Sequence, residues 1–286
     1  MIPAGFEYHR PTDVASAIEI LKTHGDEARV VAGGHSLIPM MKLRMADLAH
    51  LIDLQDIEGL KGIEIGAETV SIGAMVTQHE LITHAGLSEA LPIIREAALQ
   101  IADPQVRYLG TVGGNVANGD PGNDMPGLMQ CLDATYVIEG AEGSRTVSAR
   151  DFYQSAYFTA REDDEILTRI EIPRLPAGTG YAYEKQKRKI GDYATAACGA
   201  LVTMQGGTCT AASVAMTNLS DTPVWSEEAG AALVGTSCGP DAVAAAVAAS
   251  LAAINPTQDN RGPVEFKRHV AGVIIRRAIE GAVARA

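Results

Sequence analysis

The sequence predicts an α+β protein in which two small α/β subdomains precede a C-terminal domain of antiparallel sheet and helices. Short helix and strand patterns alternate along the 286-residue chain up to about residue 172. A Pro- and Gly-rich break follows over 173–180, and beyond it long strand patterns run into an Ala-rich helical tail. We therefore expect three domains, over 1–55, 56–175 and 176–286.

The first subdomain is expected to contain one helix and two strands. Thr12 is a candidate N-cap for a helix over 13–24, which Gly25 ends. A short β-branched strand over 28–32 runs directly into a glycine-rich turn, and a further strand is expected over 51–54. Together these elements form a small α/β unit.

The second subdomain is expected to combine a hairpin, two helices and two strands. In chain order these are the hairpin over 62–74, the helices over 77–84 and 91–101, and the strands over 134–139 and 165–172. Pro92 is tolerated because it falls in the first turn of its helix. The segment 117–126 is so rich in Gly, Pro, Asn and Asp that we expect a shaped loop there.

The C-terminal domain is expected to begin with three long strands and to end with two helices. The expected strands cover 181–187, 198–205 and 208–218, and the helices cover 241–254 and 265–284. Gly206-Gly207 separates two of the strands and predicts a tight hairpin turn.

Composition limits the partners that this chain can have. A formal net charge of −12 argues against nucleic acid or an anionic membrane as the main partner, because both favour basic surfaces. The first ten residues contain no apolar signal region, and the longest apolar run, near 242–254, is too short to span a bilayer. We therefore expect a cytoplasmic protein.

The cysteines and histidines show no spacing that is typical of a metal site. No two cysteines form a C-x-x-C pair, and the histidines considered form no i, i+4 pair. These residues are Cys131, Cys198, Cys209 and Cys238, and His35, His79, His84 and His269. We expect reduced, buried cysteines and no metal in this chain.

Two glycine-rich turns of similar composition indicate an anion-binding site. The first is VAGGHS at 31–36 and the second is TVGGN at 111–115. Adjacent glycines permit positive φ and close approach of the backbone, so several N–H groups can converge on phosphate oxygens. Ser36, Thr111 and Asn115 add short polar side chains. One such turn is weak evidence, but two predict a diphosphate that is held from both sides.

Three other chemistries fit the same glycines poorly. The segment from Gly34 to Ile38 resembles the G-x-S-x-G nucleophile elbow of hydrolases, but Ile38 occupies the final glycine position and would clash in the strained turn. The chain contains neither G-x-G-x-x-G nor G-K-[ST]. A Rossmann nicotinamide site and a P-loop are therefore both disfavoured.

The two turns resemble the FAD-binding motifs of the medium, flavoprotein subunit of molybdenum hydroxylases. The resemblance rests on VAGGHSL followed by MMKLR, and on TVGGN followed by Asp124 and Pro126. It extends over essentially the whole chain. This family includes xanthine dehydrogenases and aerobic carbon monoxide dehydrogenases, and the segments AGGHSLIPMMKLR and GDPGND are most similar to the latter group.

The resemblance implies two FAD-binding subdomains of the PCMH type, as in vanillyl-alcohol oxidase, with FAD between them and the C-terminal domain. N–H groups of both turns would hold the pyrophosphate, which suits loops that contain no lysine. The implied cofactor-binding residues are Ala32, Gly33, Gly34, His35, Ser36, Leu37, Ile101, Thr111, Val112, Gly113, Gly114, Asn115, Asp124, Leu167, Lys185 and Tyr193.

Several of these residues also have a purely structural interpretation. Asp124 corresponds to a family acid that contacts the cofactor, yet an Asp in this loop is also a common turn former. Lys185 corresponds to a family lysine near the flavin, where a cation stabilises the reduced ring, but it lies in a charge run typical of a solvated face. Tyr193 suits stacking on the flavin or a place in the core. Ile101 and Leu167 alone would be ordinary core residues.

The implied function is electron transfer within a complex, with no catalytic residue on this chain. A large subunit with molybdopterin would oxidise the substrate, a small subunit with two [2Fe-2S] clusters would relay electrons, and FAD would pass them to an external acceptor such as quinone. A dimer of heterotrimers is implied, in the cytoplasm or in peripheral contact with the inner face of the membrane. Carbon monoxide is the implied substrate. A xanthine or N-heterocycle dehydrogenase subunit, a free-standing flavin oxidase and a nucleotide-binding scaffold remain alternatives.

Overall fold

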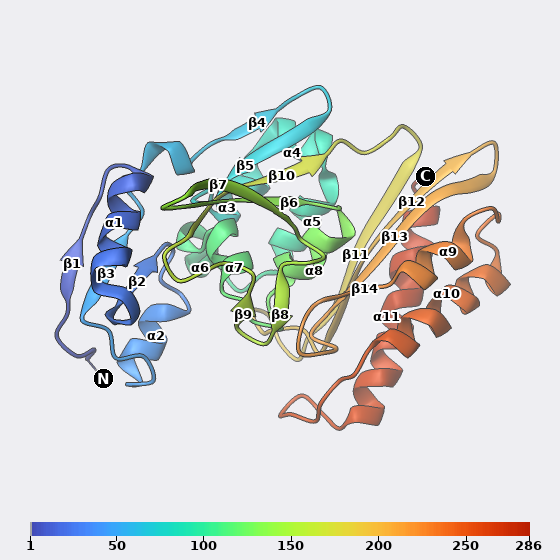
Figure 1. Cartoon of the computed structure of the whole chain (residues 1–286). Helices are drawn as coiled ribbons and strands as arrows, with labels where there is room; N and C mark the ends of the chain where they lie inside the picture. Colours follow the sequence, from blue (N-terminus) through green and yellow to red (C-terminus); the bar gives the residue numbers. More distant parts are fainter. Residues whose placement is uncertain (1) are drawn as a thin grey trace.

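The computed structural model describes residues 2–286, and three main sheets follow one another from the N-terminus to the C-terminus (Figure 1). The first sheet is parallel, and the other two are antiparallel. Helices pack against all three. The predicted α+β class is therefore confirmed, and so is the antiparallel sheet with helices at the C-terminal end.

The first unit is a small three-stranded α/β layer. It consists of β1 (Glu7–His9), α1 (Val14–His24), β2 (Ala28–Val31), α2 (Leu37–Lys42) and β3 (His50–Asp53), with 3-10 turns over Gly25–Glu27 and Glu58–Leu60. The strand order β1-β3-β2 places β3 in the centre. The N-cap of α1 is Asp13 rather than Thr12, because Asp13 Oδ1 accepts a hydrogen bond from the Ser16 N–H at 2.8 Å. The first glycine turn leaves the carboxyl end of β2.

The second unit is a five-stranded antiparallel sheet with short helices. Its strands are β4 (Ile63–Ile65), β5 (Thr69–Gly73), β6 (Thr135–Gly140), β7 (Gly143–Ser148) and β10 (Ile166–Pro173), and β8 (Tyr153–Ser155) pairs with β9 (Phe158–Thr159) outside this sheet. Its helices are α3 (Gln78–Thr83), α4 (Ala85–Ala90), α5 (Pro92–Gln100), α6 (Pro104–Leu109), α7 (Val112–Ala117) and α8 (Asp124–Cys131). In the order β4-β5-β10-β6-β7 the late strand β10 lies centrally and joins the two hairpins.

Helix α8 corrects the prediction of an irregular loop over 117–126. The loop ends at Asn123, and the helix begins at Asp124 and is buried throughout. Pro126 falls in the first turn of α8, where its missing N–H would have no partner within the helix. Local composition disfavours this helix, but packing of its apolar residues against β12 and β13 of the third unit and against α5 and α7 stabilises it.

The third unit is a four-stranded sheet with three helices. The strands are β11 (Thr179–Gln186), β12 (Ala196–Gln205), β13 (Thr208–Thr217) and β14 (Val224–Trp225), and the helices are α9 (Glu227–Leu233), α10 (Pro240–Ala253) and α11 (Val264–Val283). Gly206 and Gly207 have φ of 57° and 80°, as the predicted hairpin turn requires. No helix among residues 2–286 combines the length and apolar content of a membrane span.

The central strand β12 is buried on both faces and joins two cores. Its even-numbered residues, such as Cys198 and Ala200, pack in a cluster with α9, α10 and α11. Its odd-numbered residues Ala197 and Leu201 belong instead to the core of the second unit, with α5 and α8. Figure 1 shows the sheet between these two helical layers. The second and third units therefore share one packed interior, and this fixes the position of α8 beneath the site.

Candidate functional site

A cavity of about 1040 Å³ lies where the three units meet. Its lining comes from the turn after β2, the segment from α5 to α8, the hairpin of β8 and β9, and the loop after β11. The volume lies at the upper end of the range for small-molecule sites, about 300–1,000 Å³. All of the predicted cofactor-binding residues line this cavity except Val112.

Val112 does not line the cavity, although the resemblance implied that it would. Its side chain is fully buried in the core of the second unit, and its N–H donates to the Val76 carbonyl at 2.9 Å. Val112 therefore anchors the second turn from behind. The apolar position in TVGGN contributes packing, whereas the residues on either side of it line the cavity.

The two glycine turns lie against each other. A Cβ on Gly33 would collide with the carbonyl oxygen of Leu109, and a Cβ on Gly114 would come within 3.5 Å of the Ala32 Cβ. Of the four motif glycines only Gly34, with φ of 73°, requires the left-handed region. Gly33 is needed for close approach to the backbone just before the second turn, whereas a Cβ on Gly113 would collide with Ala74. The prediction of conformational freedom holds at Gly34 alone.

The backbone donors of the two turns differ. Within residues 2–286, the N–H groups of Gly33, Gly34, His35 and Ser36 have no hydrogen-bond partner. All four residues line the cavity, so four consecutive unpaired donors are available there, as expected for an anion site.

In the second turn the prediction of free donors is wrong. The N–H groups of Val112 and Gly113 donate to carbonyls of Val76 and Ala74, and those of Gly114 and Asn115 donate to Thr111. Since these four donors are already paired within the protein, the second turn offers polar side chains instead. The Thr111 hydroxyl and the Asn115 amide both belong to residues that line the cavity.

Asp124 and Lys185 form a buried ion pair at the base of the cavity. The Lys185 Nζ lies 2.7 Å from the Asp124 Oδ2, and their side chains are 1% and 4% exposed. The Tyr183 hydroxyl donates to the other carboxylate oxygen at 2.6 Å, and burial next to this acid raises the Tyr183 pKa well above its usual value. Neither the turn-forming interpretation of Asp124 nor the solvated interpretation of Lys185 fits this geometry.

Lys187 follows the last residue of β11, and its side chain lies on the same side as that of Lys185, as strand alternation predicts. Both Nζ atoms donate to the Gln100 carbonyl, Lys185 at 3.3 Å and Lys187 at 3.1 Å. Partial burial lowers the Lys187 pKa, and the nearby positive charge of Lys185 lowers it further.

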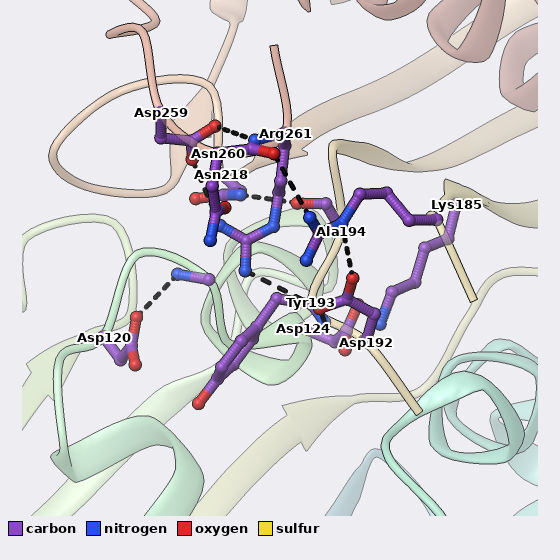
Figure 2. Close-up of polar contacts among 12 residues, drawn as sticks. Asp120, Asp124, Lys185, Asp192, Tyr193, Ala194, Asn218, Asp259, Asn260 and Arg261 are labelled. Atoms are coloured by element: carbon purple, nitrogen blue, oxygen red, sulfur yellow. Dashed lines mark hydrogen bonds and ion pairs between the residues drawn. The ribbon is translucent and has the colours of Figure 1, made fainter. Parts of the chain in front are cut away.

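Tyr193 lies at the rim of the cavity and is supported by the C-terminal loop. Figure 2 shows its ring beside Arg261, whose guanidinium carbon is 5.6 Å from the ring centroid. Arg261 also contacts the carboxylates of Asp192 and Asp259, at 3.8 and 3.1 Å. A Cβ on Gly122 would lie 2.9 Å from the Tyr193 ring, so the GDPGND loop packs closely beneath it. Tyr193 as a whole residue is 42% exposed, which is inconsistent with a core tyrosine.

Sequence reasoning missed Gln78 as a candidate site residue. Gln78 is 1% exposed and lines the cavity, and neither its side-chain oxygen nor its nitrogen has a hydrogen-bond partner in the protein. An unpaired buried amide costs about 1–3 kcal/mol, which a polar ligand would recover. In the sequence Gln78 follows the N-cap Thr77 and resembles any first-turn helix residue, so no local signal distinguishes it.

The free N–H groups, the unpaired amide and the buried lysine fit a large, polar, anionic cofactor held by backbone and neutral donors. The fold and this cavity define a flavoprotein of the FAD-binding type. Residues 4–175 match the family model described as the FAD binding domain in molybdopterin dehydrogenase, and residues 181–282 match the CO dehydrogenase flavoprotein C-terminal domain. The chain belongs to this family, and FAD is its cofactor.

Relatives of known function resemble the chain along its whole length. It is 58% identical to the carbon monoxide dehydrogenase medium chain of Afipia carboxidovorans, and the alignment covers 100% of this chain and 99% of that protein. The corresponding protein of Hydrogenophaga pseudoflava is 44% identical, with 100% and 99% covered.

Solved structures show the same fold. A chain of a cyanide-inactivated Cu,Mo-CO dehydrogenase superposes with a TM-score of 0.98 at 58% identity, and the match covers 100% of both chains. A chain of quinoline 2-oxidoreductase from Pseudomonas putida 86 gives a TM-score of 0.94 at 33% identity, and 99% of each chain is covered. The fold is thus shared by relatives that are named for different substrates.

Proposed function

We propose that this chain is the FAD-containing electron-transfer subunit of a carbon monoxide dehydrogenase. In this scheme a molybdopterin-containing large subunit oxidises carbon monoxide to carbon dioxide, and a small iron–sulfur subunit relays the electrons to this chain. Support comes from the full-length 58% and 44% identities to carbon monoxide dehydrogenase medium chains. Identity to the quinoline 2-oxidoreductase chain is lower, at 33%. N-heterocycle oxidation is therefore the second candidate.

The observation that carries the cofactor part of the proposal is the row of unpaired N–H groups from Gly33 to Ser36. Two phosphate groups would accept hydrogen bonds from this row, with the Thr111 hydroxyl and Asn115 amide on the facing side. FAD, when bound, supplies a carrier that links single-electron donors to a two-electron acceptor. The protein's part is to bind it, orient it and control which molecules reach it.

Lys185 is proposed to orient the cofactor rather than to raise its potential strongly. Asp124 compensates its charge at 2.7 Å, and the Gln100 carbonyl accepts a further hydrogen bond. The pair presents a dipole to the cavity instead of a net positive charge. Tyr193, supported by Arg261, is proposed to cover the cofactor at the rim of the cavity.

The assembly around this chain is proposed from the family alone. We infer a dimer of heterotrimers in the cytoplasm, with quinone as the external acceptor and with peripheral contact to the inner face of the membrane. In this scheme the substrate site lies on the large subunit and the iron–sulfur clusters lie on the small subunit. The membrane contact is made by the assembled complex.

The test uses the purified complex under anaerobic conditions. Absorbance bands of flavin and iron–sulfur clusters should both bleach when carbon monoxide is added, and this chain alone with FAD should reduce no dye with carbon monoxide. Bleaching by quinoline or a purine but not by carbon monoxide would show that the complex oxidises a different substrate. The proposed electron-transfer role of this chain would still hold. Robust carbon monoxide oxidation by this chain alone would exclude that role.

A further inference from the structure

Three histidines meet at one end of the first unit, outside the FAD cavity. The His9 Nε2 lies 3.0 Å from the His50 Nδ1, and the rings of His24 and His50 stack with centroids 3.5 Å apart. One ligating nitrogen from each residue can be chosen so that all three lie within 4.8 Å of one another. Spacing in the sequence hides this cluster, because His9, His24 and His50 come from β1, the end of α1 and the start of β3.

The imidazoles have few other partners in the protein. Within residues 2–286 their only side-chain hydrogen bond is the one between His9 and His50. All three side chains are partly buried, so solvent can reach the cluster without fully surrounding it. Three convergent nitrogen ligands on separate secondary-structure elements are the donor set that zinc sites commonly use.

The local charges favour a cation at this position. The carboxylate Oε2 of Glu7 lies 3.7 Å from the His50 Nδ1, and the Glu7 side chain is 67% exposed and free to turn towards the cluster. His24 is the last residue of α1, where the helix dipole favours positive charge. Glu7 therefore supplies a fourth ligand of suitable charge for a tetrahedral site.

We propose that His9, His24 and His50, with Glu7 as the fourth ligand, bind one divalent first-row metal ion of the Zn²⁺ class. Imidazole and carboxylate ligands suit Zn²⁺, with bonds of about 2.0–2.2 Å. The stacked rings of His24 and His50 would turn on binding so that one nitrogen of each points at the ion. The ion would tie α1 to both β1 and β3. Its role would be structural, because it joins three elements of the unit that presents the first glycine turn.

The site is separate from the flavin. His24 and His50 lie at the amino end of the parallel sheet, whereas the first glycine turn leaves its carboxyl end, about 13 Å away for the four residues of β2. None of the three histidines lines the FAD cavity. Loss of the metal should therefore leave FAD content and flavin reduction unchanged, which distinguishes this proposal from the proposed function.

The experiment measures zinc in the assembled complex after removal of any affinity tag. The wild type, dialysed against Zn²⁺ and then against metal-free buffer, should retain about one zinc per copy of this chain. His24→Ala should bind zinc at least about tenfold more weakly. The matched control His269→Ala, an exposed histidine on α11, should bind it as the wild type does. Flavin content should be equal in all three proteins.

A second measurement does not depend on how the variant folds. Co²⁺ added to the wild type should give visible absorption bands of a tetrahedral nitrogen-ligated ion, and excess Zn²⁺ should remove them. A wild type that retains no zinc and shows no Co²⁺ bands would overturn the proposal. Equal zinc retention by a folded His24→Ala variant would also overturn it.

Discussion

The Lys185 ammonium and the Asp124 carboxylate are 61 positions apart in the sequence and form a single buried ion pair of 2.7 Å. Asp124 is the first residue of α8, and Lys185 lies near the end of β11. The pair therefore joins the second unit to the third at the base of the cavity. Asn115 extends the connection, because its side-chain oxygen accepts from the Met125 N–H at 3.3 Å and its carbonyl accepts from Asn123.

Breaking this pair should destabilise the protein strongly. Lys185→Met leaves a buried carboxylate without its cation and should lower the free energy of unfolding by about 3–5 kcal/mol in urea titrations. Lys61→Met, which removes the exposed partner of Glu58, should cost less than about 1 kcal/mol. The double variant Asp124→Leu with Lys185→Met should be less destabilised than the sum of the two single variants. Equal effects of Lys185→Met and Lys61→Met would show that the pair is not buried.

Gly33→Ala should remove the cofactor by separating the two turns. The added methyl group would collide with the Leu109 carbonyl, and the backbone shift should cost about 1–3 kcal/mol and displace the row of free N–H groups. FAD bound per chain, measured by absorbance after gel filtration, should fall at least about tenfold. Gly59→Ala is the matched control, since its Cβ meets nothing within 4 Å and its flavin content should be normal. A Gly33→Ala protein with a full complement of bound FAD would contradict the requirement for a close approach between Gly33 and the Leu109 carbonyl.

Gln78→Leu should move two measurements in opposite directions. The apoprotein should become as stable as the wild type or more stable, because an unpaired amide that costs about 1–3 kcal/mol is removed. The affinity for FAD should fall, because a polar contact of the cofactor is lost. Gln130→Leu, at a buried site away from the cavity, should leave FAD affinity unchanged. Unchanged FAD affinity in Gln78→Leu would remove Gln78 from the site.

The pair of Glu165 and Arg145 should make stability depend on pH in the acid range. Hydrogen bonds from Arg145, at 2.6 and 2.7 Å, hold the pKa of Glu165 below its usual value. A carboxyl group with a lowered pKa binds fewer protons when folded, so its contribution is complete above its unfolded pKa and is lost as the pH falls through its folded pKa.

Glu165→Gln should therefore be less stable than the wild type at pH 7, by about 1.5–3 kcal/mol. The difference should stay constant down to about pH 4.5, the ordinary pKa of a glutamate side chain, and should shrink as the pH falls further in thermal or urea unfolding. Glu142→Gln, at an exposed hairpin position, serves as the control. Its difference in stability from the wild type should not change with pH over the same range. A constant difference between Glu165→Gln and the wild type across this range would mean that Arg145 does not hold the carboxylate.

The sequence predicts best those elements whose local pattern and final environment agree. The hairpin at Gly206-Gly207 is specified by its own turn residues, and the apolar run of β12 agrees with the burial of this strand on both faces. Helix α8 could not be predicted, because Gly, Pro, Asn and Asp disfavour it locally and only tertiary packing stabilises it. The domain limits at 55 and 175 stay an interpretation of the same patterns.

In the candidate site, too, features set by local sequence could be predicted, and features set by contacts between distant segments could not. The two glycine motifs are local, so their residues were found, although the paired N–H groups of the second turn depend on Ala74 and Val76, which the motif does not contain. Gln78 and the cluster of His9, His24 and His50 depend on distances between segments, and no spacing rule reveals them. The roles of individual residues towards FAD remain predictions.

The two-faced burial of β12 has a consequence for how the chain is made. Residues 1–175 leave the ribosome first. The inner surface of α8 stays uncovered until Ala197, Leu201 and their neighbours have been synthesised and packed against it. At about 5–20 residues per second, the remaining C-terminal segment takes roughly 5 to 20 seconds to synthesise. During that interval the nascent protein carries an open apolar surface beside a half-built cavity. The cavity is therefore complete only once the C-terminal sheet has formed, because Lys185 and Tyr193 belong to its lining.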